Sequence, residues 1–422
     1  MRLFIRNANE LITLKGSSKA PLTKMEMGKL EIIKNGSVWI ENDRIVKVGT
    51  DEELADIYQN ELPEAKIVDA SGKVVIPGLV DCHTHLVFGG SRENEFNMRL
   101  NGATYMEIME SGGGIHSTTR STREASFEEL VDKSMKHLDS FLKHGVTTVE
   151  AKSGYGLDWK TEEKQLLVAK AINENHKVDV VSTFMGAHAI PGEYKRDSEK
   201  YVDLVINEML PKVVEKNLAE FNDVFCEKGV FTPEQSKRIL QAGKELGLLP
   251  KIHADEIEPY EGAELAAELG AISAEHLLVA SDKGIQRMAE QGVIAVLLPG
   301  TAFFLMAESA RARRMIDSGV PVAISTDFNP GSSPTISLPF IMNLACMKMG
   351  MTPAEVITAV TINAAHALNR GNEIGSIEEK KRADLVVLDV PNYLQLQYFY
   401  GMNHTHTVIK NGEVVLENGV LL

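Results

Sequence analysis

Residues 74–85 read Val-Val-Ile-Pro-Gly-Leu-Val-Asp-Cys-His-Thr-His, an apolar run that ends in two histidines two positions apart. Side chains alternate between the two faces of a β-strand, so His83 and His85 are expected to point to the same side. Paired neutral imidazoles suit zinc, iron or nickel, so this stretch is the expected start of a metal site. His404 and His406 repeat the spacing, and we interpret that later pair as an ordinary strand or surface pair.

From this strand onward the chain alternates apolar strands with amphipathic, helix-like stretches, the pattern of parallel βαβ units. One helix-like stretch covers residues 233–246, with Thr232 and Pro233 as its start signal and Gly247 as its stop. Eight such strands predict an α/β fold, a closed (β/α)8 TIM-type barrel. The expected strands cover residues 74–85, 146–152, 178–188, 223–227, 249–253, 272–276, 293–298 and 320–327.

Short strands separated by turn signals occupy both ends of the chain. Asn411-Gly412, for example, lies between two apolar runs and is typical of a β-hairpin. Because these β segments flank the barrel pattern, we expect them to meet in one small β-sandwich domain made of residues 1–73 and 375–422. The barrel, with the catalytic site, is expected to cover residues 74–374.

Composition excludes several classes of protein. The 422 residues are 44% hydrophobic and 24% charged, as in an ordinary globular protein. A formal net charge of −15 argues against nucleic acid as a partner. Three cysteines make no disulfide framework and favour a reducing compartment. The first residues lack a secretory signal and no apolar stretch is long enough to span a bilayer, so we expect a cytoplasmic protein without a membrane partner.

Residues with metal-binding chemistry gather at the ends of the expected barrel strands, where the chemistry of such barrels occurs. His83, His85, His253 and Asp327 could converge as three nitrogens and one carboxylate. This set suits a divalent metal ion and leaves room for water or substrate. A metal ion lowers the pKa of its water from ~15.7 to about 7. The pattern therefore predicts hydrolysis by metal-activated water.

Acid–base candidates follow the fifth and sixth expected strands. Glu256 comes three residues after His253, where its carboxylate could move a proton from water to a leaving nitrogen. Asp255 is a neighbouring candidate for the same role. His276 ends the sixth strand and could hydrogen-bond an oxyanion. A supporting role for His276 behind the metal ligands, or a place as a further ligand, is equally compatible with its position.

Three glycine-containing loops follow barrel strands and favour ligand binding at that end. Gly89 to Arg92 follows the first strand, Ser153 to Gly156 the second, and Asn329 to Ser333 the eighth. Glycines let backbone N–H groups approach an anion closely. Arg92 can hold a carboxylate with two parallel hydrogen bonds, which indicates a carboxylate-bearing substrate.

On these residues the chain resembles the amidohydrolase superfamily, and the resemblance extends over nearly its whole length. It rests most on DCHTHLVFGGSR (81–92), KSGYGL (152–157), FMGAHAIP (184–191), HADE (253–256) and TDFNPGSSP (326–334). Within the superfamily the chain is most similar to enzymes of histidine degradation. Those enzymes hydrolyse a ring C–N bond of 4-imidazolone-5-propanoate and give N-formimidoyl-L-glutamate. The resemblance thus implies a hydrolase of cyclic amides with that small-molecule substrate.

The resemblance also implies roles for individual residues and a cofactor. One zinc or iron ion, divalent or trivalent, would be held by His83, His85, His253 and Asp327. Catalytic roles fall to Glu256, His276 and Asp327, the first two in proton transfer. Substrate and product contacts are implied for Arg92, Tyr155, His188, Asn329, Gly331 and Ser332. The resemblance further implies a homodimer.

Other members of the superfamily bind two metal ions through a modified lysine on the fourth strand. Here Lys152 lies on the second expected strand, and the fourth strand has Glu227 instead. We therefore expect one metal ion, and a second ion with Glu227 as a ligand is the alternative. An alternative function is another cyclic-amide hydrolase or a nucleobase deaminase on the same barrel. A non-catalytic scaffold is disfavoured because such proteins typically lack the metal ligands.

Overall fold

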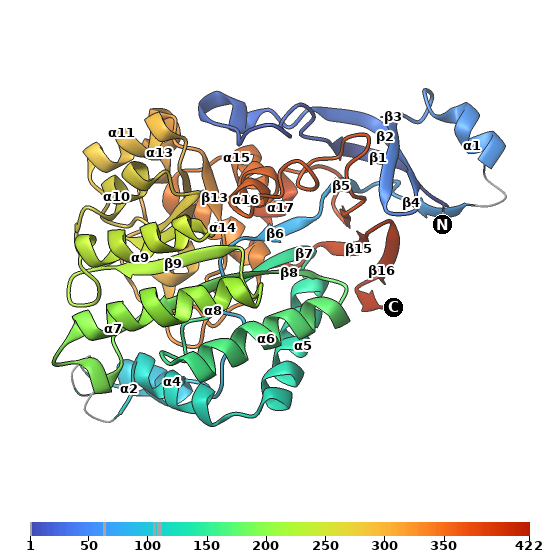
Figure 1. The fold of residues 1–422 in the computed structure, drawn as a ribbon. Helices are drawn as coiled ribbons and strands as arrows, with labels where there is room; N and C mark the ends of the chain where they lie inside the picture. Colours follow the sequence, from blue (N-terminus) through green and yellow to red (C-terminus); the bar gives the residue numbers. More distant parts are fainter. Residues whose placement is uncertain (1, 62–64, 104–106, 108–111) are drawn as a thin grey trace.

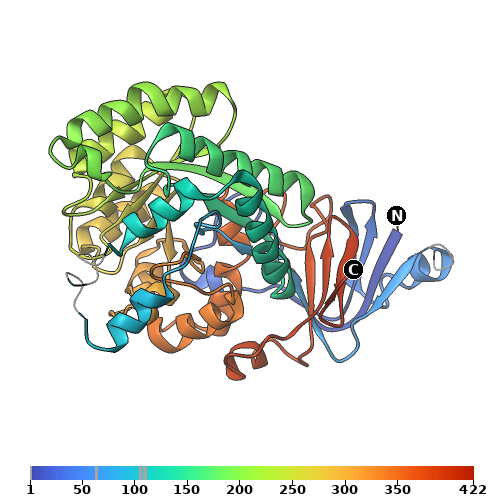
Figure 2. The same ribbon diagram turned by 90° about the horizontal axis from the view of Figure 1, so that it is seen from below.

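The computed structural model describes residues 2–61, 65–103, 107 and 112–422 and contains two sheets. One is a parallel sheet of eight strands closed into a barrel; the other is a nine-stranded sheet built from both ends of the chain (Figure 1). Figure 2 shows the late strands, in red, beside the early strands, in blue, on one side of the barrel. No helix among the described residues is long and apolar enough to cross a membrane.

The barrel strands pair in chain order, each parallel to the next. They are β6 (Leu79–Asp81), β7 (Val146–Lys152), β8 (Asp179–Ala187), β9 (Phe221–Cys226), β10 (Leu249–Ala254), β11 (Ser273–His276), β12 (Ile294–Leu297) and β13 (Val322–Ile324). The barrel closes just beyond β6 and β13, where Asp327 N donates to His83 O at 3.0 Å and His85 N donates to Phe328 O at 2.9 Å. The predicted (β/α)8 barrel is confirmed.

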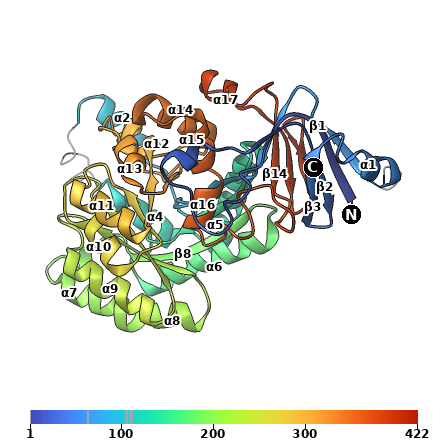
Figure 3. The ribbon, with the colours of Figure 1, turned by 90° about the horizontal axis from the view of Figure 1, so that it is seen from above.

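Helices cover the outside of the barrel (Figure 3). They are α4 (Ile115–Glu124), α5 (Phe127–Lys143), α6 (Trp159–Asn175), α7 (Ser198–Leu204), α8 (Leu210–Glu215), α9 (Pro233–Glu245), α10 (Gly262–Leu269), α11 (Asp282–Gln291), α13 (Ala312–Ser318), α14 (Leu338–Met349), α15 (Pro353–Ala359) and α16 (Ile362–Ala367). The start signal expected for α9 works as predicted, since Thr232 accepts a hydrogen bond from Gln235 N and Gln235 reaches back to Thr232 N. Short helices α2 (Glu93–Leu100) and α12 (Pro299–Phe304) lie in loops after β6 and β12, and the π-helix η4 (Val205–Met209) lies between α7 and α8. The remaining described helices are α1 (Ala55–Glu61), α17 (Gln395–Tyr398) and the 3-10 turns η1 (Lys24–Gly28) and η3 (Gly192–Tyr194).

The terminal sheet joins the two ends of the chain through one strand. Its strands are β1 (Arg2–Ile12), β2 (Ile32–Glu41), β3 (Arg44–Thr50), β4 (Lys66–Asp69), β5 (Val74–Pro77), β14 (Leu385–Leu388), β15 (Thr405–Lys410), β16 (Glu413–Glu417) and β17 (Val420–Leu421). β5 pairs with β1 on one side and with β14 on the other. The strands of this sheet share a buried apolar core, which includes Leu3, Ile5, Val75, Leu385 and Ile409.

The single strand predicted over residues 74–85 is wrong, because the structure divides it between the two sheets. β5 belongs to the terminal sheet and β6 opens the barrel. The break falls at Pro77 and Gly78: proline has no N–H to donate, and a Cβ on Gly78 would overlap the Thr147 side chain. The division into a composite β domain and a barrel stays a prediction, and β5 pairs within the terminal sheet.

Ion pairs connect the barrel to the terminal sheet. Asp179, the first residue of β8, lies with Oδ2 2.8 Å from Lys410 Nζ of β15, and Arg382 contacts the same oxygen. Lys410 is fully buried and also lies 2.6 Å from Asp384 Oδ2. A buried ammonium is stable only with such partners, so these contacts fix the sheet against the bottom of β8.

Candidate metal centre and active-site pocket

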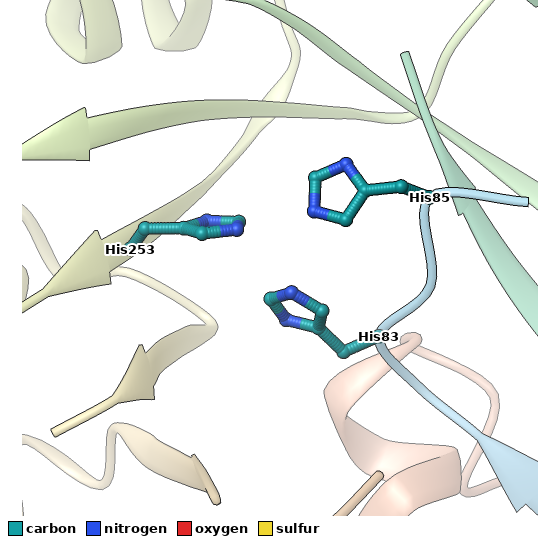
Figure 4. Close-up of side chains that lie close together, drawn as sticks. All are labelled: His83, His85 and His253. Atoms are coloured by element: carbon teal, nitrogen blue, oxygen red, sulfur yellow. The ribbon is translucent and has the colours of Figure 1, made fainter. Parts of the chain in front are cut away.

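Three histidines converge where β6 and β10 end (Figure 4). His83 and His85 follow β6, and His253 is in β10. The ring centroids lie 4.6 Å apart for His83 and His253, 5.6 Å for His83 and His85, and 5.6 Å for His85 and His253. One nitrogen from each ring lies within 4.8 Å of the others, and all three side chains are buried. Both histidines of the first pair lie beyond the end of β6, and their rings nevertheless point to the same side.

Asp327 brings a carboxylate to the same point from the end of β13. Its Oδ1 lies 3.3 Å from His83 Nε2 and 3.8 Å from His85 Nε2, while Thr301 of α12 donates to its Oδ2 at 2.6 Å. Burial opposes the charge, but the hydrogen bond and charge of His83 outweigh it and lower the pKa of Asp327 to about 2. The backbone of Asp327 has a φ of 52°, a left-handed conformation that turns its side chain away from ordinary strand alternation.

The donor atoms fit a divalent metal ion. Nε2 of His253 is buried without a hydrogen-bond partner among the described residues, and the buried Nε2 of His83 faces only the Asp327 carboxylate, at 3.3 Å. Such atoms are costly unless they find a partner, and a cation supplies one. Nitrogens and one carboxylate oxygen are the ligands of many catalytic sites for zinc and related metals. His276 forms a second group with His83 and Asp327 within the same 4.8 Å, so its place as a further ligand also fits.

Glu256 and His276 lie together beside these donors. His276 Nδ1 is 3.6 Å from Glu256 Oε1. Burial, with smaller contributions from the negative charges of Asp327 and Glu227, raises the pKa of Glu256 to about 8. Burial lowers the pKa of His276, so its ring is neutral at pH 7. A carboxyl group whose pKa lies near neutrality is suited to taking up and releasing a proton.

Two of the open candidates have structural roles in the loop after β10. Asp255 accepts hydrogen bonds from the N–H groups of Tyr260 (2.7 Å) and Ala263 (2.9 Å). Glu227 accepts from the N–H groups of Glu256 (3.2 Å) and Ile257 (2.9 Å). Neither carboxylate belongs to a group of donor atoms among the described residues that could hold a metal ion. Their geometry fixes the loop that carries Glu256.

A pocket of about 760 Å³ opens above the histidines. All the predicted site residues except His83 line it, and His83 lies beneath His85 with no exposed surface. The lining residues that the sequence indicated are His85, Arg92, Tyr155, His188, His253, Glu256, His276, Asp327, Asn329, Gly331 and Ser332. One end of the barrel therefore brings together side chains that are up to 249 positions apart in the chain, between His83 and Ser332.

Tyr155 and His188 form one wall of this pocket. The His188 ring stacks on His85 with centroids 4.8 Å apart, and the Tyr155 ring lies 5.3 Å from it. Burial lowers the pKa of His188 to about 3, so the ring is neutral, and its Nδ1 lies 3.1 Å from Gly154 O. Gly154 has a φ of 110°, and a Cβ there would lie 2.9 Å from His188 Cβ. Glycine is therefore required for His188 to approach this closely.

Arg92 and the loop after β13 also line the pocket. Arg92 Nε and Nη2 both donate to Glu95 Oε2, at 2.9 and 2.8 Å, and its Nη1 lies against Gly331. The N–H groups of Gly331 and Ser332 each donate to Asn329 Oδ1 at 2.8 Å. The Asn329 side chain thus accepts the backbone hydrogen bonds that the glycine-containing sequence suggested for an anion, and the Arg92 guanidinium lies against the same loop.

Several residues that line or support the site were not predicted from the sequence. Apolar and cationic groups line the outer pocket, and charged groups are buried beneath the histidines. The residues that line the pocket are Phe88, Phe96, Arg99, Lys133, His137 and Phe304. Thr301 supports Asp327 through a hydrogen bond, and the buried charged residues are Glu150, Asp223, Lys251 and Glu275. Glu150 and Lys152 sit two apart on β7, so period-two alternation could have indicated a shared inward face. No local pattern distinguishes His137 or Phe304.

Known proteins resemble this chain at two levels. By fold, it superimposes on an adenosine deaminase from Xanthomonas campestris with bound Zn (TM-score 0.73, 18% identity, covering 100% of this chain and 94% of that one). It also superimposes on E. coli guanine deaminase (TM-score 0.73, 14% identity, 99% of both chains). At these identities the likeness shows the shared fold.

By sequence, the Amidohydrolase family matches residues 74–415. Imidazolonepropionase of Geobacillus sp. (strain WCH70) is 68% identical over 419 residues, 99% of each chain. Imidazolonepropionase of Brevibacillus brevis (strain 47 / JCM 6285 / NBRC 100599) is 66% identical over 419 residues, again 99% of each chain. With the donor set and the pocket above, these matches show that the chain belongs to the amidohydrolase family and, within it, to the imidazolonepropionases.

Proposed function

We propose that this protein hydrolyses 4-imidazolone-5-propanoate to N-formimidoyl-L-glutamate, a step of histidine degradation in which water opens a ring C–N bond. The convergence of His83, His85, His253 and Asp327 on the floor of a pocket that also contains Glu256 carries the proposal. The names of the relatives support the same reaction.

We propose His83, His85, His253 and Asp327 as the ligands of one metal ion, zinc or iron. A metal ion held there lowers the pKa of a bound water to about 7 and polarises a carbonyl oxygen. Lys152 and Glu227 are both engaged by other partners, which supports one ion rather than two. His276 is proposed as a hydrogen-bond donor to the carbonyl oxygen, because its ring is neutral and adjoins Glu256.

Glu256 is the proposed proton carrier. It takes the proton from the attacking water and delivers it to the ring nitrogen, whose bond to the carbonyl carbon then breaks. Its burial and its pKa of about 8 keep both protonation states accessible near neutral pH. Asp327 remains ionised throughout, because its pKa is held near 2.

Arg92 is proposed to bind the propanoate carboxylate, beside the loop of Asn329, Gly331 and Ser332. Tyr155 and His188 would then lie against the imidazolone ring, since both side chains line the same pocket.

The ultraviolet absorbance of 4-imidazolone-5-propanoate, followed with and without the protein, tests the proposal. We expect enzyme-dependent loss with N-formimidoyl-L-glutamate as product. Loss no faster than the spontaneous reaction, with release of ammonia from nucleobases instead, would establish the deaminase alternative.

Cytoplasmic location and a homodimer are further proposals. The cysteines Cys82, Cys226 and Cys346 are all free thiols, which supports a reducing compartment. Light scattering during size-exclusion chromatography distinguishes a dimer from a 46.4 kDa monomer.

A further inference from the structure

Five charged side chains are buried together directly beneath His83 and His253. Glu150 and Lys152 come from β7, Asp223 from β9, Lys251 from β10 and Glu275 from β11, and each is at most 1% exposed. Burying so many charges is costly unless they form close pairs. Two of the carboxylates, those of Glu275 and Asp223, face the histidines.

Each of these two carboxylates contacts one histidine on the side away from the proposed metal ion. Glu275 Oε2 is in close contact with His83 Nδ1, and Asp223 Oδ2 lies 3.0 Å from His253 Nδ1. Asp223 also accepts the backbone N–H of His253 through Oδ1 at 3.2 Å. A carboxylate beside Nδ1 favours the proton on that nitrogen. The lone pair is then on Nε2, which faces Asp327 Oδ1 at 3.3 Å in His83 and has no hydrogen-bond partner among the described residues in His253.

The two lysines hold the carboxylates in place. Lys152 Nζ lies 2.7 Å from Asp223 Oδ2, 2.9 Å from Glu275 Oε2 and 3.1 Å from Glu150 Oε1. Lys251 Nζ lies 2.9 Å from Glu150 Oε1 and 3.4 Å from Glu275 Oε1. Asp223, His253 and Glu275 by themselves could hold a metal ion. The Lys152 ammonium already contacts the same two carboxylate oxygens, so it supplies the cation there.

We propose that Glu275 and Asp223 are positioning residues for the metal site: they fix the ring orientation and tautomer of His83 and His253 so that both present Nε2 to the ion. The proposal rests on the proposed function only in taking these two histidines as ligands. Carboxylates behind metal-binding histidines raise the basicity of the ring and restrict its rotation, and their loss typically weakens metal binding about 10- to 100-fold.

Zinc affinity of the full-length protein tests this role. The metal-free protein is titrated with Zn²⁺ against a chelating indicator, for the wild type, Glu275→Gln, Asp223→Asn and His83→Ala. The matched control is Asp384→Asn, which also removes a buried carboxylate charge paired with a buried lysine (Lys410, 2.6 Å) but at the junction with the terminal sheet. We expect a 10- to 100-fold larger Kd in Glu275→Gln and Asp223→Asn, and an unchanged Kd in Asp384→Asn.

The outcomes separate this proposal from the metal site itself. Equal Kd values for the wild type, Glu275→Gln and Asp223→Asn, with His83→Ala much weaker, would overturn the positioning role alone. A wild type that binds Zn²⁺ no more tightly than His83→Ala would overturn the metal site and this proposal with it. If Glu275→Gln does not fold, Glu275→Asp replaces it. The visible spectrum of the Co²⁺-loaded protein should also change in the two positioning variants and not in Asp384→Asn, because it reports the ligand geometry.

Discussion

Substitution of Arg92 by lysine should weaken substrate binding without stopping the reaction. The guanidinium uses Nε and Nη2 on Glu95 Oε2 and keeps Nη1 against Gly331, beside the pocket. A lysine at this position would place one ammonium close to Glu95 and could not contact Glu95 and the substrate carboxylate with the same planar geometry. The variant therefore loses a charge-assisted hydrogen bond to the substrate.

The magnitude follows from that one bond. A hydrogen bond to a charged group contributes about 1.5–3 kcal/mol, which corresponds to a rise of roughly 10- to 150-fold in KM. The value of kcat should change little, since Arg92 does not contact Glu256 or the proposed metal ligands in any ion pair or hydrogen bond among the described residues. Initial rates over a range of 4-imidazolone-5-propanoate concentrations separate the two constants.

A matched control and an analogue sharpen this test. Arg313 forms a similar close pair with Glu355, at 2.9 and 3.0 Å, away from the pocket. Arg313→Lys should leave KM unchanged. The carboxamide analogue of the substrate should bind Arg92→Lys and the wild type almost equally. The same KM for Arg92→Lys and wild type with the natural substrate would refute the role of Arg92, as would an equal loss with the analogue.

Three further perturbations have defined outcomes. Glu256→Gln should lower kcat about 10²- to 10⁴-fold with unchanged metal content, because the proton carrier is removed; near-normal kcat in the metal-loaded variant would exclude that role. Gly154→Ala should destabilise the protein by about 2–4 kcal/mol, through a strained φ and a Cβ placed against His188, and an unshifted thermal midpoint would contradict this. Burial raises the pKa of Asp179, but Lys410 and Arg382 outweigh it and lower this pKa in the folded protein, so the ionised carboxylate stabilises the fold above pH ~3.8 and this stabilisation is lost as the pH falls through the lower folded pKa. The difference in free energy of unfolding between wild type and Asp179→Asn, measured in urea, should therefore narrow below pH ~3.8. A difference that does not depend on pH would refute the ion pairs of Asp179 as its cause.

Much of the site could be predicted because its signals are local. Each proposed metal ligand stands at or just after the end of an apolar strand, and the closure of a barrel brings such ends together. His83 and His85 were expected on one side from their spacing of two alone. His276 and Asp327 reach the site with left-handed backbone conformations (φ 71° and 52°) that the sequence does not reveal. Their positions at the ends of strands were nevertheless sufficient to predict both as site residues.

The remaining features depend on contacts that the chain order does not encode. Pro77 and Gly78 divide an apolar run whose hydrophobicity is continuous, and only the partners β14 and β7 decide where each half pairs. The buried cluster needs Lys152 and Glu275 to meet across the barrel, 123 positions apart in the chain. The internal hydrogen bonds of the loop after β13 likewise follow from the Asn329 side chain rather than from its glycine.

A titration of activity against metal content tests the proposed single metal site most directly. The protein is stripped with a chelator, metal ions are returned in known amounts, and loss of 4-imidazolone-5-propanoate is measured at each ratio. We expect no activity in the stripped protein and a linear rise in activity that ends at one ion per chain, and no such rise in His253→Ala. Full activity after stripping, or a rise that ends only at two ions per chain, would contradict a single metal ion held by His83, His85, His253 and Asp327.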